Sequence, residues 1–151
     1  MPLLDKERSF ITLSGSRLYF AKPTEESFGI NGVVRRLSNI NRFNGDVPYS
    51  VAEHSLLACE LATVKKLSVL HRYYALMHEL DEATGLGDIC TPIKKAFFTV
   101  DTMDKLNSFR ATINELYNIP EVLPNDIHEI DFECFVIEVN RFYGKAGLSL
   151  Y

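Results

Sequence analysis

The sequence predicts a mostly α-helical protein. Apolar side chains recur at the three- and four-residue spacing of helices over most of the chain. Ser, Gly and Pro residues stand between these segments, at positions typical of caps and turns. A length of 151 residues fits one domain, and a hydrophobic content of 46% is enough for one sizeable core. We therefore expect a single helical domain over residues 1–151.

The N-terminal part is the exception to the helical pattern. In residues 9–22, two short apolar segments flank Ser14–Gly15–Ser16, as in a β-hairpin, so we expect a short β-ribbon here. Helical spacing resumes with Val33 and Leu37 and predicts a first helix over residues 31–42.

Two helices are predicted in the middle of the chain. Ser50 is followed three residues later by Glu53, which is the pattern of a capping box, and apolar residues continue from there to residue 64. Ser68 is placed to cap the next helix, which we expect to continue until Gly85.

The remaining helices are separated by loops rich in Gly and Pro. A loop is predicted over residues 42–48, ahead of the Ser50 helix. Later in the chain we expect a short helix near residues 95–98 and longer helices over residues 102–117 and 125–143. Gly144 is the expected end of the last helix.

Charge and cysteine usage restrict the partners and the compartment. A formal net charge of −4 argues against a nucleic-acid polymer or an anionic membrane, although a small anionic ligand needs only a few local cations. Three widely spaced cysteines favour neither a disulfide framework nor a zinc knuckle. No apolar segment approaches the roughly 20 residues that span a bilayer, and the N-terminus is acidic where a signal peptide is basic. We expect a cytoplasmic protein.

Histidine and carboxylate residues lie beside apolar positions of the segment 74–83. His78 is followed by Glu79 and by two further acids, and such groups are costly to bury unless a cation compensates them. His54 lies near the start of the preceding predicted helix, and Asp131 lies near the apolar side of the last one. A lone helical histidine is more often structural, so the metal-site hypothesis depends on the combination.

Other acids have competing interpretations. Glu79 and Asp81 could be acids of a solvated helix surface, and for Asp81 we favour that interpretation. Asp88 could equally cap the turn that follows it. For Glu138 we favour an ion pair with Arg42 or Arg141 over a role in catalysis.

Several short motifs follow one another in a fixed order along the chain. They are Arg42–Gly45, Tyr49–Leu57, Ala75–Ala83, Gly87–Ile89 and Pro92–Lys94, followed by Asp131 and Glu138. Their order resembles that of the HD-domain phosphohydrolases, most closely the small bacterial and phage members that act on deoxynucleotides. The resemblance covers about residues 9–145.

The resemblance implies a helical HD-domain fold with a divalent-metal site. The implied ligands are His54, His78, Glu79 and Asp131, and Glu82 would assist proton transfer. Mixed imidazole and carboxylate ligands suit Mn, Co, Zn or Fe.

Substrate contacts are implied for a second set of residues. Arg42 and Lys94 would neutralise phosphate charge, as guanidinium and ammonium groups do. Phe43 could be ordinary core or could stack on a base. Asp88 and Pro92 complete the implied substrate-binding set.

The sequence departs from the family pattern at two places. Glu79 stands where the family has aspartate, so its carboxylate is one methylene further from the backbone. One extra residue also falls within Thr84–Gly85–Leu86.

The implied activity is that of a metal-dependent deoxynucleotide phosphohydrolase, in the cytoplasm of a bacterium or a phage-infected host. We favour the triphosphohydrolase reaction on dATP, which releases the deoxynucleoside and triphosphate. The alternatives are a deoxyribonucleoside 5′-monophosphatase and a nucleotide-binding protein that has lost its chemistry because of Glu79. A purely helical interaction module explains the histidines and Asp131 less well. The resemblance also implies a homo-oligomer.

Overall fold

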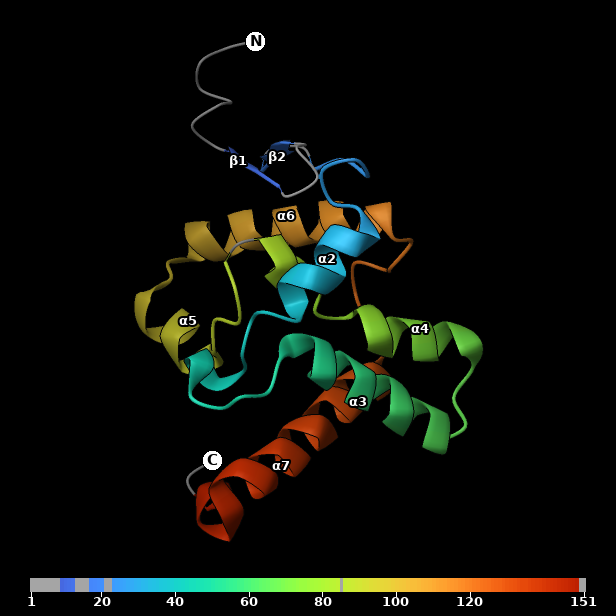
Figure 1. Cartoon of the computed structure of the whole chain (residues 1–151), viewed down its shortest axis with the longest axis vertical. Coiled ribbons are helices and arrows are strands. Elements are labelled where there is room, and N and C mark those ends of the chain that lie inside the picture. The colour runs from blue at the N-terminus through green and yellow to red at the C-terminus, as the bar shows by residue number, and fades with distance from the viewer. Residues whose placement is uncertain (1–8, 13–16, 21–22, 85, 150–151) are drawn as a thin grey trace.

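The computed structural model describes residues 9–12, 17–20, 23–84 and 86–149, and it is mostly helical, as predicted (Figure 1). Two short 3₁₀ segments, η1 (Phe43–Gly45) and η2 (Leu80–Thr84), accompany the helices. The helices are α2 (Ile30–Leu37), α3 (Val51–Val64), α4 (Val69–Met77), α5 (Thr91–Phe97), α6 (Val100–Leu116) and α7 (Asn125–Leu148).

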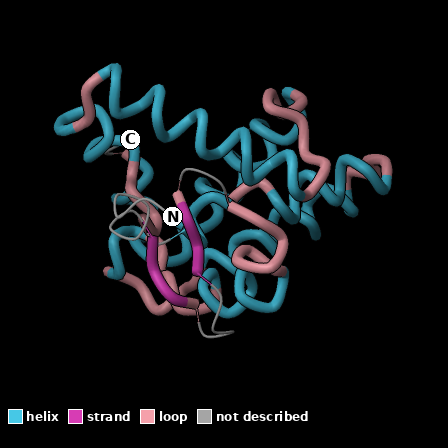
Figure 2. Tube along the Cα trace, turned by 90° about the horizontal axis from the view of Figure 1, so that it is seen from above, coloured by secondary structure: helices cyan, strands magenta, loops and turns pink. Residues whose placement is uncertain are grey.

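The expected β-ribbon is present at the N-terminal side of the fold. Strand β1 (Ser9–Ile11) pairs antiparallel with β2 (Arg17–Tyr19), and the two strands lie next to each other in the view from above (Figure 2). Leu18 of β2 is fully buried and attaches the ribbon to the core. The predicted turn, Ser14–Gly15–Ser16, lies outside the described residues.

The two predicted N-terminal caps are confirmed. The Ser50 hydroxyl accepts a hydrogen bond from the Glu53 amide at 3.2 Å, and the Glu53 carboxylate accepts one from the Ser50 amide at 2.7 Å. This capping box fixes the start of α3, so His54 lies in its first turn. The Ser68 hydroxyl accepts from the His71 amide and starts α4 in the same way.

The first helix is shorter than the predicted range of residues 31–42. Helix α2 ends at Leu37, and the chain then pairs with the residues ahead of α3. Asn41 forms an isolated antiparallel bridge with Ser50, and the Arg42 amide donates to the Tyr49 carbonyl at 2.8 Å. This long-range pairing replaces the helical hydrogen bonds that local spacing had favoured.

The predicted helix from Ser68 to Gly85 is interrupted at the histidine. Helix α4 ends at Met77, His78 is its C-cap, and η2 follows. The His78 Nδ1 donates to the Ala75 carbonyl at 2.7 Å, which in a continued α-helix would accept from the Glu79 amide. The side chain of His78 therefore competes with the backbone at the point where the helix ends.

The later helices agree with prediction apart from their boundaries. Helix α5 begins earlier than residue 95, because Pro92 occupies its first turn, where a missing amide hydrogen is tolerated. Thr99 caps α6 by accepting from the Thr102 amide. Helix α7 extends beyond Tyr143, but Gly144 has φ 67° and ψ −171°, so the regular helix breaks at the predicted residue.

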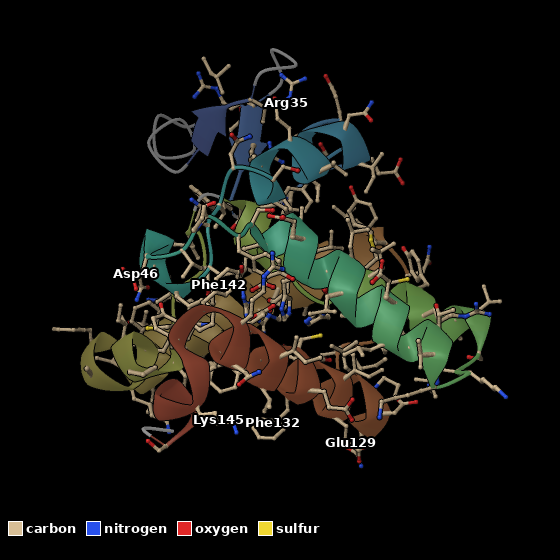
Figure 3. The ribbon with its side chains drawn as sticks, turned by 60° about the horizontal axis from the view of Figure 1, so that its bottom comes forward. Arg35, Asp46, Glu129, Phe132, Phe142 and Lys145 are labelled. Carbon is tan, nitrogen blue, oxygen red and sulfur yellow. The ribbon has the colours of Figure 1, made fainter. Side chains whose placement is uncertain are left out.

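Packing around α3 and α4 determines where the candidate site lies. These two helices pack against each other, and α7 crosses both of them (Figures 1 and 3). Small buried side chains on α3 and α4, Ala58, Ala62 and Ala75, face Ile127 and Ile130 of α7. The start of α3, the junction of α4 with η2 and the middle of α7 thus meet at one place. Among the described helices, none has the length and apolarity needed to cross a membrane.

Candidate metal centre

Three separate parts of the chain contribute the four predicted metal ligands. His54 comes from the first turn of α3, His78 and Glu79 from the end of α4, and Asp131 from α7. One ligand atom from each residue lies within 4.8 Å of all the others. The structure therefore brings together all four residues in the predicted set.

The separations between these atoms fit ligands that share one ion. The Nε2 atoms of His54 and His78 are 3.1 Å apart, and Asp131 Oδ1 lies 3.2 Å from the first and 3.5 Å from the second. Glu79 Oε1 lies 3.7 Å from His54 Nε2 and 3.6 Å from His78 Nε2. Ligands about 2.1 Å from one metal ion in octahedral or tetrahedral geometry are roughly 3.0–3.4 Å apart. The observed separations, from 3.1 to 3.7 Å, lie within or slightly above this range, so small adjustments of the side chains would let the two imidazoles and two carboxylates share a divalent transition metal.

A hydrogen bond at Nδ1, on the side of the ring away from the other candidate ligands, fixes the orientation of each imidazole. The Nδ1 of His54 lies 2.6 Å from the carboxylate of Glu138, which is itself buried, and Nδ1 of His78 donates to the Ala75 carbonyl. Because Nδ1 carries the hydrogen in each pair, Nε2 is the nitrogen available for a metal.

Electrostatics in the cluster favour charged imidazoles when no metal is bound. Burial would lower the pKa of His54, but hydrogen bonds to Asp131 and Glu138 outweigh it and raise the pKa to about 9. Burial would raise the pKa of Asp131, but hydrogen bonds from His54 and His78 bring it well below its usual range. A bound metal ion would displace the imidazole protons through which His54 and His78 now interact with the carboxylates.

Glu79 reaches the cluster despite its extra methylene. It follows the C-cap of α4 and is not part of a continued helix, and its carboxylate points toward both imidazoles at the distances given above. Its side chain is only 13% exposed, so the interpretation of Glu79 as a solvated surface acid is wrong.

Glu82 is buried in η2, close in sequence to these ligands. The predicted helix up to Gly85 would have contained both His78 and Glu82, but α4 ends at Met77, so Glu82 is not one turn further along the same α-helix. Burial, together with the nearby charges of Glu79 and Asp88, raises the pKa of Glu82 to about 10. Its Oε2 is buried and has no hydrogen-bond partner among the described residues. The side chain is therefore protonated at neutral pH, and its role in proton transfer stays a prediction.

Arg42 lies directly beside the cluster. Its Nε and Nη2 atoms donate to Glu138 at 3.2 and 3.1 Å, which is one of the two ion pairs expected for that carboxylate. Its Nη1 lies 3.6 Å from Glu79 Oε1. Glu138 consequently contacts both His54, a candidate metal ligand, and the Arg42 guanidinium, which faces the candidate ligand Glu79.

The loop after Arg42 is held in a strained conformation. Phe43 has a φ of 55°, which is costly for a residue with a side chain. Its amide donates to Asp88 at 3.2 Å, and its ring packs against Phe135 and Tyr143 of α7, with centroids 6.3 and 5.4 Å away. These contacts show that Phe43 packs on α7, while stacking on a base stays a prediction.

The other predicted substrate residues are located beyond this loop. Asp88 binds the Phe43 amide, and the N-cap of α5 is Cys90, so the capping alternative for Asp88 is wrong. Pro92 and Lys94 lie in the first turns of α5. Burial raises the pKa of Asp88, and the charges of Arg42 and Lys94 oppose that shift. Within the Thr84–Leu86 segment, which carries the extra residue, Gly85 lies outside the described residues.

The sequence did not predict an ion pair that lies next to the site, between the buried Asp81 and the partly exposed Arg110. Asp81 is 7% exposed and accepts from Arg110 Nη2 of α6 at 2.8 Å, so the expectation that it is a surface acid is wrong. Arg110 is 29 residues further along the chain, and no local pattern indicated its position.

The fold and the site define a helical protein with a candidate divalent-metal centre, and comparison with known proteins places the chain in a family. No family model matches the sequence. An uncharacterized protein of Rhodobacter capsulatus is 37% identical over 123 residues, which cover 76% of this chain and 61% of that relative, less than two thirds of its length. The uncharacterized protein YfdR of Escherichia coli strain K12 is 33% identical over 133 residues, which cover 86% of this chain and 70% of YfdR. The chain belongs to the same family as YfdR.

Proposed function

We propose that this protein is a metal-dependent phosphohydrolase of the HD-domain type that acts on deoxynucleotides, and that its preferred reaction is the triphosphohydrolase reaction on dATP. The observation that carries the proposal is the convergence of His54, His78, Glu79 and Asp131, with ligand atoms within 4.8 Å of one another. The resemblance of the motif order to the HD-domain family supports the choice of substrate.

His54, His78, Glu79 and Asp131 would hold the metal, with Mn, Co, Zn or Fe as suitable ions. When bound, a divalent ion at this position lowers the pKa of a water molecule and polarises a phosphoryl oxygen. Arg42 is already charged and held by Glu138, so it can donate to phosphate oxygens without losing its partner. Lys94 adds a second positive charge from α5.

Glu82 is the proposed proton carrier. Burial and the neighbouring acids raise its pKa in the metal-free protein, which favours the protonated form that a general acid needs. In the proposed reaction a water oxygen forms a bond to the α-phosphorus while the bond from phosphorus to O5′ breaks. Glu82 gives its proton to O5′ and regains one from the attacking water, so the products are the deoxynucleoside and triphosphate.

We further propose that the protein works in the cytoplasm of a bacterium or a phage-infected host, as a homo-oligomer whose only other partner is its nucleotide substrate. A 5′-monophosphatase is the second candidate reaction. It would use the same ligands and Arg42, and it would require no site for a longer phosphate chain.

Product analysis tests the proposal directly. Purified protein is incubated with dATP or dAMP in the presence of Mn or Co, and the products are separated by ion-exchange chromatography. We expect deoxyadenosine and triphosphate from dATP. Orthophosphate from dAMP alone would favour the monophosphatase, and no product from any deoxynucleotide would support a nucleotide-binding protein without the chemistry.

A further inference from the structure

A cavity of about 210 Å³ lies beside the candidate metal centre, between α6 and the start of α7. One of its lining residues is the metal-ligand His78, so the cavity and the centre share a wall. The polar residues Arg110, Asn114 and His128 line it together with aliphatic side chains of the 119–123 segment. The residues proposed above for phosphate binding, Arg42 and Lys94, do not line this cavity.

Arg110 lines this cavity and has hydrogen-bond donors that its contact with Asp81 does not use. Its Nη2 donates to Asp81 at 2.8 Å, and its Nε is buried without a hydrogen-bond partner among the described residues. A guanidinium has five N–H donors, so a single contact leaves most of them available. The Arg110 side chain is 40% exposed, so donors that Asp81 leaves available are accessible to an anionic ligand in the cavity.

The attachment of Arg110 parallels that of Arg42. Each guanidinium is held by a buried carboxylate, Glu138 for Arg42 and Asp81 for Arg110. Each also lies near a metal ligand, because Arg42 approaches Glu79 and Arg110 shares its cavity with His78. A single phosphate at the metal centre needs one such arginine, whereas a chain of phosphates carries more charge and extends further.

We propose that Arg110, in the cavity beside His78, binds the phosphates of a polyphosphate chain that lie beyond the one at the metal centre. The substrate class is then a deoxynucleoside triphosphate and not a monophosphate. This inference rests on the proposed function, and it identifies a binding residue that the sequence did not indicate. Glu121, an exposed acid that also lines the cavity, opposes the anion and sets a limit on its affinity.

Calorimetric titration with inorganic tripolyphosphate tests the inference without turnover. Tripolyphosphate is added as its magnesium salt, so that it does not remove the metal ion from the protein. Orthophosphate serves as the comparison with a single phosphate. We expect Arg110→Gln to weaken tripolyphosphate binding by roughly 10- to 100-fold, as for the loss of a charge-assisted hydrogen bond, while orthophosphate binding changes by less than about 2-fold. Equal tripolyphosphate affinity in the wild type and the variant would overturn the inference.

Further variants guard against misfolding and nonspecific charge effects. Arg110→Lys keeps a positive partner for Asp81 and should weaken tripolyphosphate binding by a smaller factor, so it carries the test if Arg110→Gln does not fold. Glu121→Gln should strengthen binding by a few-fold. Lys105→Gln removes the same charge from an exposed position of α6, where Lys105 pairs with Asp101, and should change nothing. A loss in Lys105→Gln equal to that in Arg110→Gln would contradict a specific site.

The outcome is distinguishable from failure of the proposed function. Tripolyphosphate binding that depends on Arg110 in a protein that hydrolyses no deoxynucleotide would support the cavity and contradict the enzyme. If Arg110→Gln hydrolysed dATP and dAMP each as efficiently as the wild type does, the result would support the proposed enzyme and contradict the role of Arg110 in phosphate binding. A change confined to the preference among dATP, dGTP and dCTP would assign the cavity to the base and overturn the inference.

Discussion

The carboxylate of Glu138 lies 2.6 Å from Nδ1 of His54 and thereby determines which imidazole nitrogen faces the other three ligands. The same carboxylate accepts two hydrogen bonds from Arg42. Glu138 therefore links His54, a proposed metal ligand, to Arg42, which is proposed to bind phosphate, and we expect both halves of the proposed site to depend on this positioning residue.

Replacing Glu138 by Gln should weaken metal binding. The amide cannot compensate the charge of Arg42 and orients His54 less strongly, so we expect a loss of roughly 10- to 100-fold in Mn affinity. The fold should also lose up to about 3–5 kcal/mol of stability, because a buried guanidinium would be left without its counter-charge. Metal titration and thermal unfolding of the same preparation measure the two effects. Unchanged Mn affinity in a folded variant would contradict the positioning role.

Shortening Glu79 to Asp should weaken the centre, even though Asp is the residue at this position in the HD-domain family. The Glu79 carboxylate now lies 3.6 and 3.7 Å from the two Nε2 atoms, and removing a methylene would draw it away from them. We expect Mn affinity to fall by about 10-fold, as for loss of one good ligand contact. Competition with a chelating dye measures the Mn affinity. Tighter Mn binding in Glu79→Asp would contradict this prediction and show that the longer side chain weakens metal binding.

Glu82→Gln should make the metal-free protein more stable and the enzyme inactive. The folded-state pKa of Glu82 is about 10, above the value of 4.5 expected when unfolded. The folded state thus binds the extra proton between these values, and stability falls as pH rises through that window. At pH 7 the free energy of unfolding of the variant should be higher than that of the wild type by up to about 3 kcal/mol. The wild type loses about 1.4 kcal/mol of stability for each pH unit above the unfolded pKa. The difference in free energy of unfolding between the variant and the wild type, measured from unfolding curves, should be larger at pH 8 than at pH 5, because the titration of His54 contributes equally to both proteins.

Full hydrolytic activity in Glu82→Gln would contradict the proton-transfer role, whatever the variant's stability. Glu121→Gln is a suitable control, because Glu121 is an exposed acid that lies outside η2 and should leave the pH dependence of unfolding unchanged.

Metal affinity should rise with pH. The His54 imidazole keeps its proton up to a pKa of about 9, and a metal must displace that proton from Nε2. Affinity should therefore increase by up to about 10-fold per pH unit between pH 6.5 and pH 9. The stability that the charged imidazole contributes to the metal-free protein is fully present below pH 6.5 and is lost as pH rises through 9. Competition titrations at pH 6.5, 7.5 and 8.5 measure the slope, and a flat profile would contradict the assignment.

The sequence was sufficient for the helices with strong local signals. The capping box of Ser50 and Glu53 and the glycine at 144 predicted the start of α3 and the break in α7, because each depends on residues near one another in the chain. The end of α2 and the break after Met77 were not predictable in this way. The first depends on pairing of Asn41 with Ser50, and the second on a side chain that binds its own helix.

The candidate site shows the same division. The four ligands were predicted from motif order, and the structure brings them together. The attachment of Arg110 to Asp81 depends on how α6 packs against η2, and the burial of Asp81 cannot be deduced from a segment in which charged and apolar residues alternate.

The proposed function depends above all on the binding of one metal ion by His54, His78, Glu79 and Asp131. The most direct test is elemental analysis of metal-stripped protein after equilibration with Mn or Co and dialysis, with His78→Asn as the comparison. We expect about one ion per chain in the wild type and a large loss in the variant. No ion retained by the wild type, or equal retention in folded His78→Asn, would contradict it.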